Sequence, residues 1–435
     1  MATAVGSSIA LTGDARIDGL LQGGAWQFSG PALLTYSFSA NTEPGDPVWS
    51  SYPALAAAFA AAATAWSNVA NVAFAEAGTG SVITQSPADI AVALENDPTV
   101  PLVALSVFPD PQFVDASFLP LIEETRASYP NPEGDVLLNI GFSQLTDLLQ
   151  PGGWGLWVLV HELGHALGLK HTADDGANGR PTFAELGIAA QDAVQHTVMS
   201  SNGAQIAVHG NPATPMPLDI LAIQHIYGAN LAYHTGDDVY VLANDGVMRT
   251  VWDAGGIDTF DASTLSFETT IDLREGAFSS HGTIVGTMTA VAYHTVIENA
   301  IGGAGSDLII GNAAANALSG GPGFGNDTLD GGTGADTLAG GSGNDSYRID
   351  NPADVVIEEA GSGTDHVFSR ASSWTMPANV ENLTLEGAGN FDATGNAGAN
   401  VILGNTGANL LDGGLAPDRL EGAGGDDTYV IGAAG

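Results

Sequence analysis

The chain has 435 residues, of which 44% are hydrophobic, so it is long enough to form two or three domains with sizeable cores. Its 49 acidic residues outnumber 9 basic ones, and the net charge of −40 excludes non-specific nucleic-acid binding and disfavours docking on an anionic membrane. The sequence has no run of 18 consecutive apolar residues, so it predicts no membrane-spanning segment. Cysteine is absent, so bound metal is the expected substitute for disulfides.

Residues 1–230 are expected to form a mixed α and β domain, because strand-like alternation and helical periodicity follow one another. The alternation in "LLTYSFS" predicts a strand over 33–39, and an alanine-rich segment predicts a helix over 52–72. The remaining predicted elements are strands over 88–94 and 134–140, a long proline-rich loop over 98–132, and a helix over 216–230 closed by Gly228.

The stretch "HELGHALGLKH" predicts a catalytic zinc site. His161 and His165 are four residues apart and share one face of a helix, and Gly168 permits the turn that returns His171 to them. Three nitrogen ligands with an open position are typical of catalytic zinc, and Glu162 lies within reach of that position. A coincidental buried histidine pair is the alternative. It is disfavoured because every fixed position of H-E-x-x-H-x-x-G-x-x-H, the metzincin signature, is matched.

From about residue 231 a nine-residue period appears. "GGAGSDLII" (302–310), "GGTGADTLA" (331–339) and "GGSGNDSYR" (340–348) fit G-G-x-G-x-D-x-U-x, where U is a large apolar residue. Tight glycine turns, a carboxylate and an inward apolar residue predict a parallel β-roll that binds several Ca²⁺ between turns, whereas a flexible linker would not keep this phase. The expected calcium contacts of this block are Gly303, Gly305, Asp307, Asp327, Gly332, Gly334, Asp336, Gly341, Gly343 and Asp345.

The rest of the carboxy-terminal half divides into a spacer and a second block. Residues 349–394 break the period and are expected to be a β-rich spacer. In the second block, 395–435, asparagine replaces most of the aspartates, so fewer ion sites are expected and a linker is a stronger alternative. The chain end, "DDTYVIGAAG", echoes the segment that begins "DSYR" at Asp345, which predicts that the natural protein continues further.

Together these features resemble the serralysins, secreted metzincin proteases of Gram-negative bacteria with a calcium-binding β-roll. The resemblance lies in "HELGHALGLKH", "TVMSSN", "LDILAIQHIYGAN", "WDAGGIDTFDAS" and "VIENAIGGAGSD". It implies an α+β fold: a metzincin catalytic domain (21–230) after a candidate pro-segment (1–20), then a β-roll whose first block ends at 348. It also implies one zinc on the three histidines, Glu162 as catalytic base, Met199 as the Met-turn residue, and calcium contacts at Asp253, Gly255, Gly256, Asp258 and Glu298.

The same resemblance predicts a secreted zinc endopeptidase that acts on proteins or peptides, with type I secretion, an extracellular location and a monomeric state. One position departs from the family: Ser201 stands where serralysins have a tyrosine near the zinc. Loss of one oxyanion donor typically costs on the order of 10²–10³ in rate, so the means of oxyanion stabilisation is open. The alternative function is a calcium-dependent adhesive or matrix module with a weak protease head.

Overall fold

The computed structural model describes residues 2–6, 9–40, 47–97, 103–110, 132–174, 180–204 and 207–430. The chain divides into two compact units, which are described separately. The amino-terminal unit comprises residues 1–233, 245–254 and 284–293, and the carboxy-terminal unit comprises 234–244, 255–283 and 294–435.

A five-stranded sheet forms the centre of the amino-terminal unit, with the strand order β4-β3-β5-β7-β6. All neighbours are parallel except β6, which is antiparallel to β7 at the edge. The buried apolar runs of β5 and β7 account for their central positions. The strands are β3 (Leu33–Ala40), β4 (Ala73–Val82), β5 (Ile90–Glu95), β6 (Ala104–Ser106) and β7 (Val136–Asn139).

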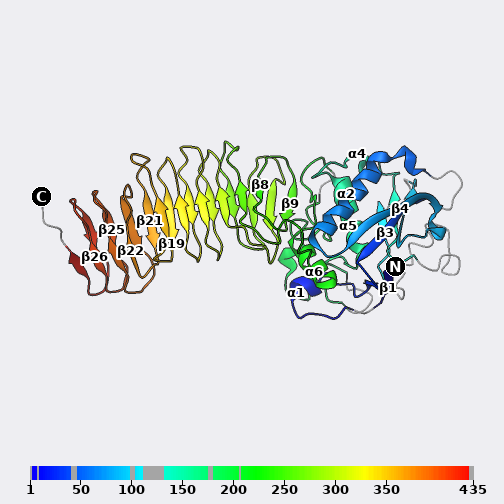
Figure 1. The fold of residues 1–435 in the computed structure, drawn as a ribbon, viewed down its shortest axis with the longest axis horizontal. Coiled ribbons are helices and arrows are strands. Elements are labelled where there is room, and N and C mark those ends of the chain that lie inside the picture. The colour runs from blue at the N-terminus through cyan, green and yellow to red at the C-terminus, as the bar shows by residue number, and fades with distance from the viewer. Residues whose placement is uncertain are drawn as a thin grey trace. The chain divides into compact units, whose positions relative to one another are not determined.

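Two helices of this unit contact each other beside the sheet (Figure 1). Helix α2 (Pro53–Val69) begins at a proline and buries Leu55, Phe59 and Trp66. Helix α5 (Trp154–Ala166) is buried along its whole length and contacts β6 and β7. This contact places the histidine motif next to the edge of the sheet. The other helices among the described residues of this unit are α1 (Ala15–Asp18), α4 (Ser143–Asp147) and α6 (Pro217–Tyr227), with 3-10 turns at Trp49–Ser51, Ile83–Gln85 and Ala189–Gln191.

Several sequence predictions differ from the structure in this unit. The loop predicted over 98–132 contains strand β6, because its residues pair with β7, and residues 98–102 and 111–131 lie outside the described part. The helix predicted over 52–72 ends at Val69, where Ala70 becomes extended and the Asn71 amide donates to the Gly228 carbonyl. Unpredicted strands are β1 (Ala2–Val5), its antiparallel partner β2 (Ala25–Phe28), β4, and the parallel pair β9 (Met248–Val251) and β13 (Met288–Val291).

The carboxy-terminal unit is a roll of short strands stacked along the chain (Figure 1). One sheet has the order β20-β18-β16-β14-β10-β8, a second contains β27-β25-β23-β21-β19-β17-β15-β11-β12, and a third has the order β22-β24-β26-β28. The pairs are parallel except β11 with β12. The strands are β8 (Val239–Val241), β10 (Thr259–Asp261), β11 (Thr270–Asp272), β12 (Phe278–Ser280), β14 (Asn299–Ile301), β15 (Leu308–Ile310), β16 (Ala317–Ser319), β17 (Thr328–Asp330), β18 (Thr337–Ala339), β19 (Ser346–Ile349), β20 (Val355–Ile357), β21 (His366–Ser369), β22 (Ser373–Thr375), β23 (Asn382–Leu385), β24 (Asp392–Thr394), β25 (Val401–Leu403), β26 (Leu410–Asp412), β27 (Arg419–Glu421) and β28 (Thr428–Val430).

The inward residue of each nonapeptide forms the core of the roll. Ile309, Leu329 and Tyr347 pair in register from strand to strand and are fully buried. Val367 and Leu383 continue this row through the segment predicted as a spacer. Residues 349–394 therefore interrupt the sequence period without interrupting the sheet.

Candidate functional site

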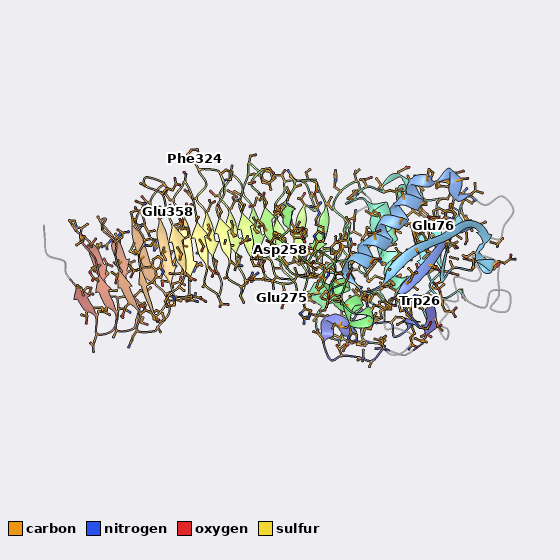
Figure 2. The ribbon with its side chains drawn as sticks, in the orientation of Figure 1. Trp26, Glu76, Asp258, Glu275, Phe324 and Glu358 are labelled. Atoms are coloured by element: carbon orange, nitrogen blue, oxygen red, sulfur yellow. The ribbon has the colours of Figure 1, made fainter. Side chains whose placement is uncertain are left out.

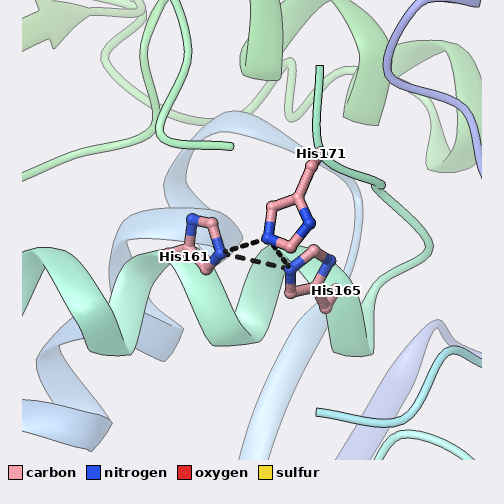
Figure 3. Close-up of side chains that lie close together, drawn as sticks. All are labelled: His161, His165 and His171. Carbon is pink, nitrogen blue, oxygen red and sulfur yellow. Dashed lines mark hydrogen bonds between the residues drawn. The ribbon is translucent and has the colours of Figure 1, made fainter. Parts of the chain in front are cut away.

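The three histidines of the motif converge on one point (Figure 3). Their Nε2 atoms are 3.0 to 3.1 Å apart. His161 and His165 share a face of α5. The helix ends at Ala166 and Gly168 follows with φ +105°. The Leu169 amide donates to the Gly164 carbonyl, which turns the chain so that His171 faces the helix. A Cβ at Gly168 would lie 2.5 Å from the Gly24 carbonyl oxygen, so the turn requires glycine.

The second ring nitrogen of each histidine already has a partner. Nδ1 of His161 is 2.7 Å from the Val198 carbonyl oxygen, and Nδ1 of His165 is 2.7 Å from that of Leu169. Nδ1 of His171 lies 2.8 Å from a carboxylate oxygen of Asp174. Acceptors at all three Nδ1 atoms place the protons there, so each Nε2 directs a lone pair at the common point.

A zinc ion fits this arrangement. Zn–N bonds of about 2.0–2.1 Å in a tetrahedral site put the nitrogens ~3.3 Å apart, close to the spacing found here. The imidazoles of His161 and His165 are also held neutral, as metal ligands must be. Burial lowers the pKa of His161 to about 4, and burial followed by the neighbouring His161 lowers the pKa of His165 well below its usual value.

Glu162 is a buried carboxylate beside the three histidines. Its Oε2 accepts a hydrogen bond of 2.9 Å from the hydroxyl of Ser106, which is the last residue of strand β6. Burial raises the pKa of Glu162 to about 7, while the Ser106 hydrogen bond and His171 act in the opposite direction. A carboxylate with this environment can exchange a proton near neutral pH.

Met199 lies directly under the motif helix. It is fully buried, and a Cβ at Gly164 would be 2.7 Å from its sulfur. The preceding residues are held by Asp219, which accepts a hydrogen bond from the Thr197 hydroxyl and one of 2.7 Å from the Val198 amide. Burial raises the pKa of Asp219 to about 7. Ser201, at the family's tyrosine position, is exposed.

The predicted calcium carboxylates form two rows along the roll. In one row, each aspartate accepts a hydrogen bond at Oδ1 from the backbone amide of the preceding one: 2.8 Å from Asp307 to Asp327 and 2.7 Å from Asp327 to Asp345. Asp336 belongs to the other row, and its buried Oδ2 has no hydrogen-bond partner. Burial, followed by the neighbouring carboxylates, raises the pKa of Asp327 to about 7 and that of Asp336 to about 6.

The predicted calcium-site glycines either have positive φ or lie where a side chain would meet neighbouring backbone. Gly332, Gly334, Gly341, Gly343, Gly255 and Gly256 have positive φ, whereas Gly303 and Gly305 are required because a Cβ would meet the backbone of residues 265–268. Glu298 accepts a hydrogen bond of 2.8 Å from the Asp258 amide, and both Asp258 and Asp253 are buried.

Asparagine occupies the aspartate position in three turns and acts differently there. The side-chain amide of Asn316 donates to the Glu298 carbonyl at 2.9 Å, that of Asn400 to Val380 at 3.0 Å, and that of Asn409 to Phe391 at 2.9 Å. Each amide therefore links its turn directly to a preceding one.

Several contacts of the site lie outside the residues named from the sequence. Asp174 could have been found, since it follows the third histidine by three positions. No sequence pattern pointed to Ser106 or Asp219. Ser106 is 56 residues from its partner Glu162, and Asp219 is 22 and 21 residues from its partners Thr197 and Val198.

The fold and the site define a mixed helix–strand domain with a three-histidine cluster, followed by a parallel β-roll, which confirms the predicted fold class. Residues 218–373 match the family model described as Peptidase M10 serralysin C terminal, and residues 394–429 match the RTX calcium-binding nonapeptide repeat. These matches imply zinc and calcium as the metals. No helix within the described ranges is long and apolar enough to cross a membrane.

Comparison with curated relatives also shows similarity to the serralysins. The chain is 32% identical over 275 residues to a serralysin of Proteus mirabilis, which covers 58% of this chain and 53% of the relative. It is 40% identical over 189 residues to metalloprotease AprA of Pseudomonas entomophila (38% and 39% covered) and 41% identical over 186 residues to serralysin C of Dickeya chrysanthemi (38% of each). The matches thus span about half of the first relative and about two fifths of the others. The predicted resemblance to the serralysins is confirmed.

Proposed function

We propose that the chain is a secreted, calcium-stabilised zinc endopeptidase. The observation that carries this proposal is the triangle of Nε2 atoms, 3.0 to 3.1 Å apart, with the Glu162 carboxylate beside it. His161, His165 and His171 would hold the zinc. When bound there, the metal supplies Lewis acidity that polarises the scissile carbonyl.

Glu162 is the proposed general base. Its side chain is 7% exposed and is anchored by Ser106, so the carboxylate keeps one position beside the histidines. It takes a proton from the attacking water and then delivers that proton to the leaving amine, a role that typically contributes 10²–10⁴ in rate. With Ser201 in the family's tyrosine position, the developing oxyanion relies on the other groups of the site.

The location and the domain roles follow the same resemblance. Release through a type I secretion system would place the protein outside a bacterial cell, as a monomer that cleaves proteins or peptides. The catalytic domain is assigned to 21–230, and 1–20 to a pro-segment. The boundary is close to the motif, since the Leu20 carbonyl accepts a hydrogen bond of 2.8 Å from the Lys170 amide.

Casein zymography combined with metal analysis tests the proposal. Glu162→Gln should keep one zinc per chain and lose at least about 10²-fold in activity, since proton transfer needs the carboxylate and zinc binding needs the imidazoles. His171→Ala should lose both zinc and activity. Glu359→Gln, at an exposed position of the roll, is the matched control.

Wild-type activity in Glu162→Gln would rule out this mechanism. A zinc-loaded wild type that cleaves no protein would instead favour the calcium-dependent adhesive or matrix function.

A further inference from the structure

The third histidine of the cluster is not fixed by burial as the other two are. His161 and His165 lie on helix α5 and are 9% and 6% exposed, whereas 47% of the His171 side chain is exposed. Figure 3 shows His171 on a separate segment that faces the helix. The backbone of this segment must therefore be held by other contacts if the three Nε2 atoms are to stay 3.0 to 3.1 Å apart.

The end of helix α5 is held from outside at two successive carbonyls. The indole of Trp26, which is labelled in Figure 2, donates to the Ala166 carbonyl at 2.9 Å. The Tyr227 hydroxyl donates to the Leu167 carbonyl at 2.8 Å. Both contacts satisfy carbonyls that the helix itself leaves without partners. They end at Leu167, before the segment that carries the third histidine.

A buried lysine holds that segment from inside. Lys170 is the only lysine of the sequence, and it is 1% exposed. Its ammonium group donates to the His171 carbonyl at 3.2 Å and to the Asp174 carbonyl at 2.8 Å. These carbonyls belong to the two ends of one turn, in which the Asp174 amide donates to the His171 carbonyl at 3.3 Å. Thr172, inside the turn, is anchored separately through its hydroxyl to Asp192 at 2.6 Å.

An ammonium group at this position is unfavourable in two respects. Burial of a cation is costly unless hydrogen bonds compensate for it, and a positive charge close to a zinc site repels the metal. A methionine of similar length would fill the same space without either cost. What only the ammonium provides is its pair of directed hydrogen bonds to the ends of the turn.

We propose that Lys170 is a positioning residue for the third zinc ligand. Its two hydrogen bonds fix the backbone of His171 and that of Asp174, whose carboxylate lies 2.8 Å from Nδ1 of His171. The ligand and its acceptor are thus ordered before the metal arrives, so less conformational entropy is lost when zinc binds. This role rests on the zinc site proposed above and is tested without any activity assay.

The zinc affinity of Lys170→Met in the full chain tests this role, measured by competition with a chromophoric chelator. The affinity should fall by about 10- to 100-fold, as when other supports of a metal ligand are removed. Gln224→Met deletes a comparable bond of 2.9 Å, from a side-chain nitrogen to the Val69 carbonyl, and should keep the wild-type affinity. Unchanged or higher affinity in Lys170→Met would overturn the proposal. A wild type that binds no zinc would instead refute the zinc site itself.

A second measurement needs no variant. Because Lys170 is the only lysine, incorporation of ¹⁵N-labelled lysine gives a single side-chain signal in the nuclear magnetic resonance spectrum of the wild-type chain. A buried ammonium bonded to two carbonyls exchanges its protons slowly, so the signal should be visible at neutral pH in the metal-free protein. Zinc should shift this signal, since one of its acceptors belongs to His171. A signal that is absent from the folded protein, or unchanged at zinc saturation, would overturn the proposal.

Discussion

Single side chains around the histidines determine how well the metal is held. The 2.8 Å contact from His171 to Asp174 is the only one of the three Nδ1 contacts described here in which the acceptor is a carboxylate. Its charge strengthens His171 as a ligand and fixes the proton on Nδ1. This hydrogen bond also lowers the pKa of Asp174, so the carboxylate stays ionised.

Asp174→Asn should weaken zinc binding by about 10- to 100-fold, the usual cost of removing such a partner. Competition with a chromophoric zinc chelator measures this affinity without any activity assay. Asp147→Asn, at an exposed position of α4, is the control. Equal zinc affinity in the Asp174 and Asp147 variants would contradict the role of Asp174.

Ser106 is expected to position the general base. Ser106→Ala removes the donor to Glu162, and hydrogen bonds to charged groups contribute roughly 1.5–3 kcal/mol. The turnover number kcat should fall by up to about 100-fold, with little change in KM and no loss of zinc. Ser143→Ala, at an exposed position, should behave as wild type. A raised KM at unchanged kcat would mean that Ser106 contributes to substrate binding instead.

The roll contains two kinds of turn, with either aspartate or asparagine at the same position. The aspartate turns at Asp336, Asp345 and Asp365 each have a buried, unsatisfied oxygen that suits a cation. The asparagine turns instead donate their own amide hydrogens to a neighbouring carbonyl. The asparagine turns thus make the inter-turn link without a metal. Calcium dependence should therefore differ from turn to turn.

Asn316→Asp should convert a calcium-independent turn into a calcium-dependent one. The new carboxylate faces the Glu298 carbonyl, so without calcium the roll should lose roughly 1–3 kcal/mol of unfolding free energy. Calcium should restore most of that loss. Thermal melts in chelator and in calcium measure both effects, with the exposed Asn326→Asp as control. A melting temperature that drops equally in both conditions would contradict this account.

At the scale of the whole molecule, the charge of −40 makes the two units respond differently to calcium. The amino-terminal unit has an apolar core around α2 and α5, whereas most short strands of the roll bury only one or two side chains and its carboxylates are closely spaced. Ordering its glycine-rich backbone is entropically expensive, so the binding of ions supplies part of the folding free energy.

Calcium chelation should unfold the roll first. Hydrogen exchange on the full chain should show that β15 to β21 lose protection while α5 keeps it, and self-cleavage should begin in the carboxy-terminal half. Glu162→Gln serves as the control in which cleavage stops but the loss of protection remains. Persistent protection of β15 to β21 in excess chelator would refute a calcium-dependent roll.

Acid should partly replace calcium. The pKa values of about 7 for Asp327 and about 6 for Asp336 lie above the unfolded value near ~3.9, so the folded chain binds more protons between those limits. In chelator, roll stability should therefore rise as the pH falls from 7 towards 5. Circular dichroism at both pH values measures this, and the double variant Asp327→Asn, Asp336→Asn should show a smaller change.

The sequence by itself determined what depends on local backbone geometry. A spacing of four puts His161 and His165 on one helical face, Gly168 permits the return of His171, and a nine-residue period with one inward apolar residue builds a parallel roll. Each of these patterns uses residues within a single turn or repeat, and their arrangement follows from backbone angles alone.

Only the tertiary structure decided which distant residues meet. Ser106 reaches Glu162 because β6 pairs antiparallel with β7 and contacts α5. Asp219, on helix α6, reaches the Val198 amide beside Met199. Glu358 joins Asp345 because parallel strands stack in register across the spacer. These contacts are set by pairing between strands whose connecting segments differ in length. No periodicity along the chain encodes that pairing.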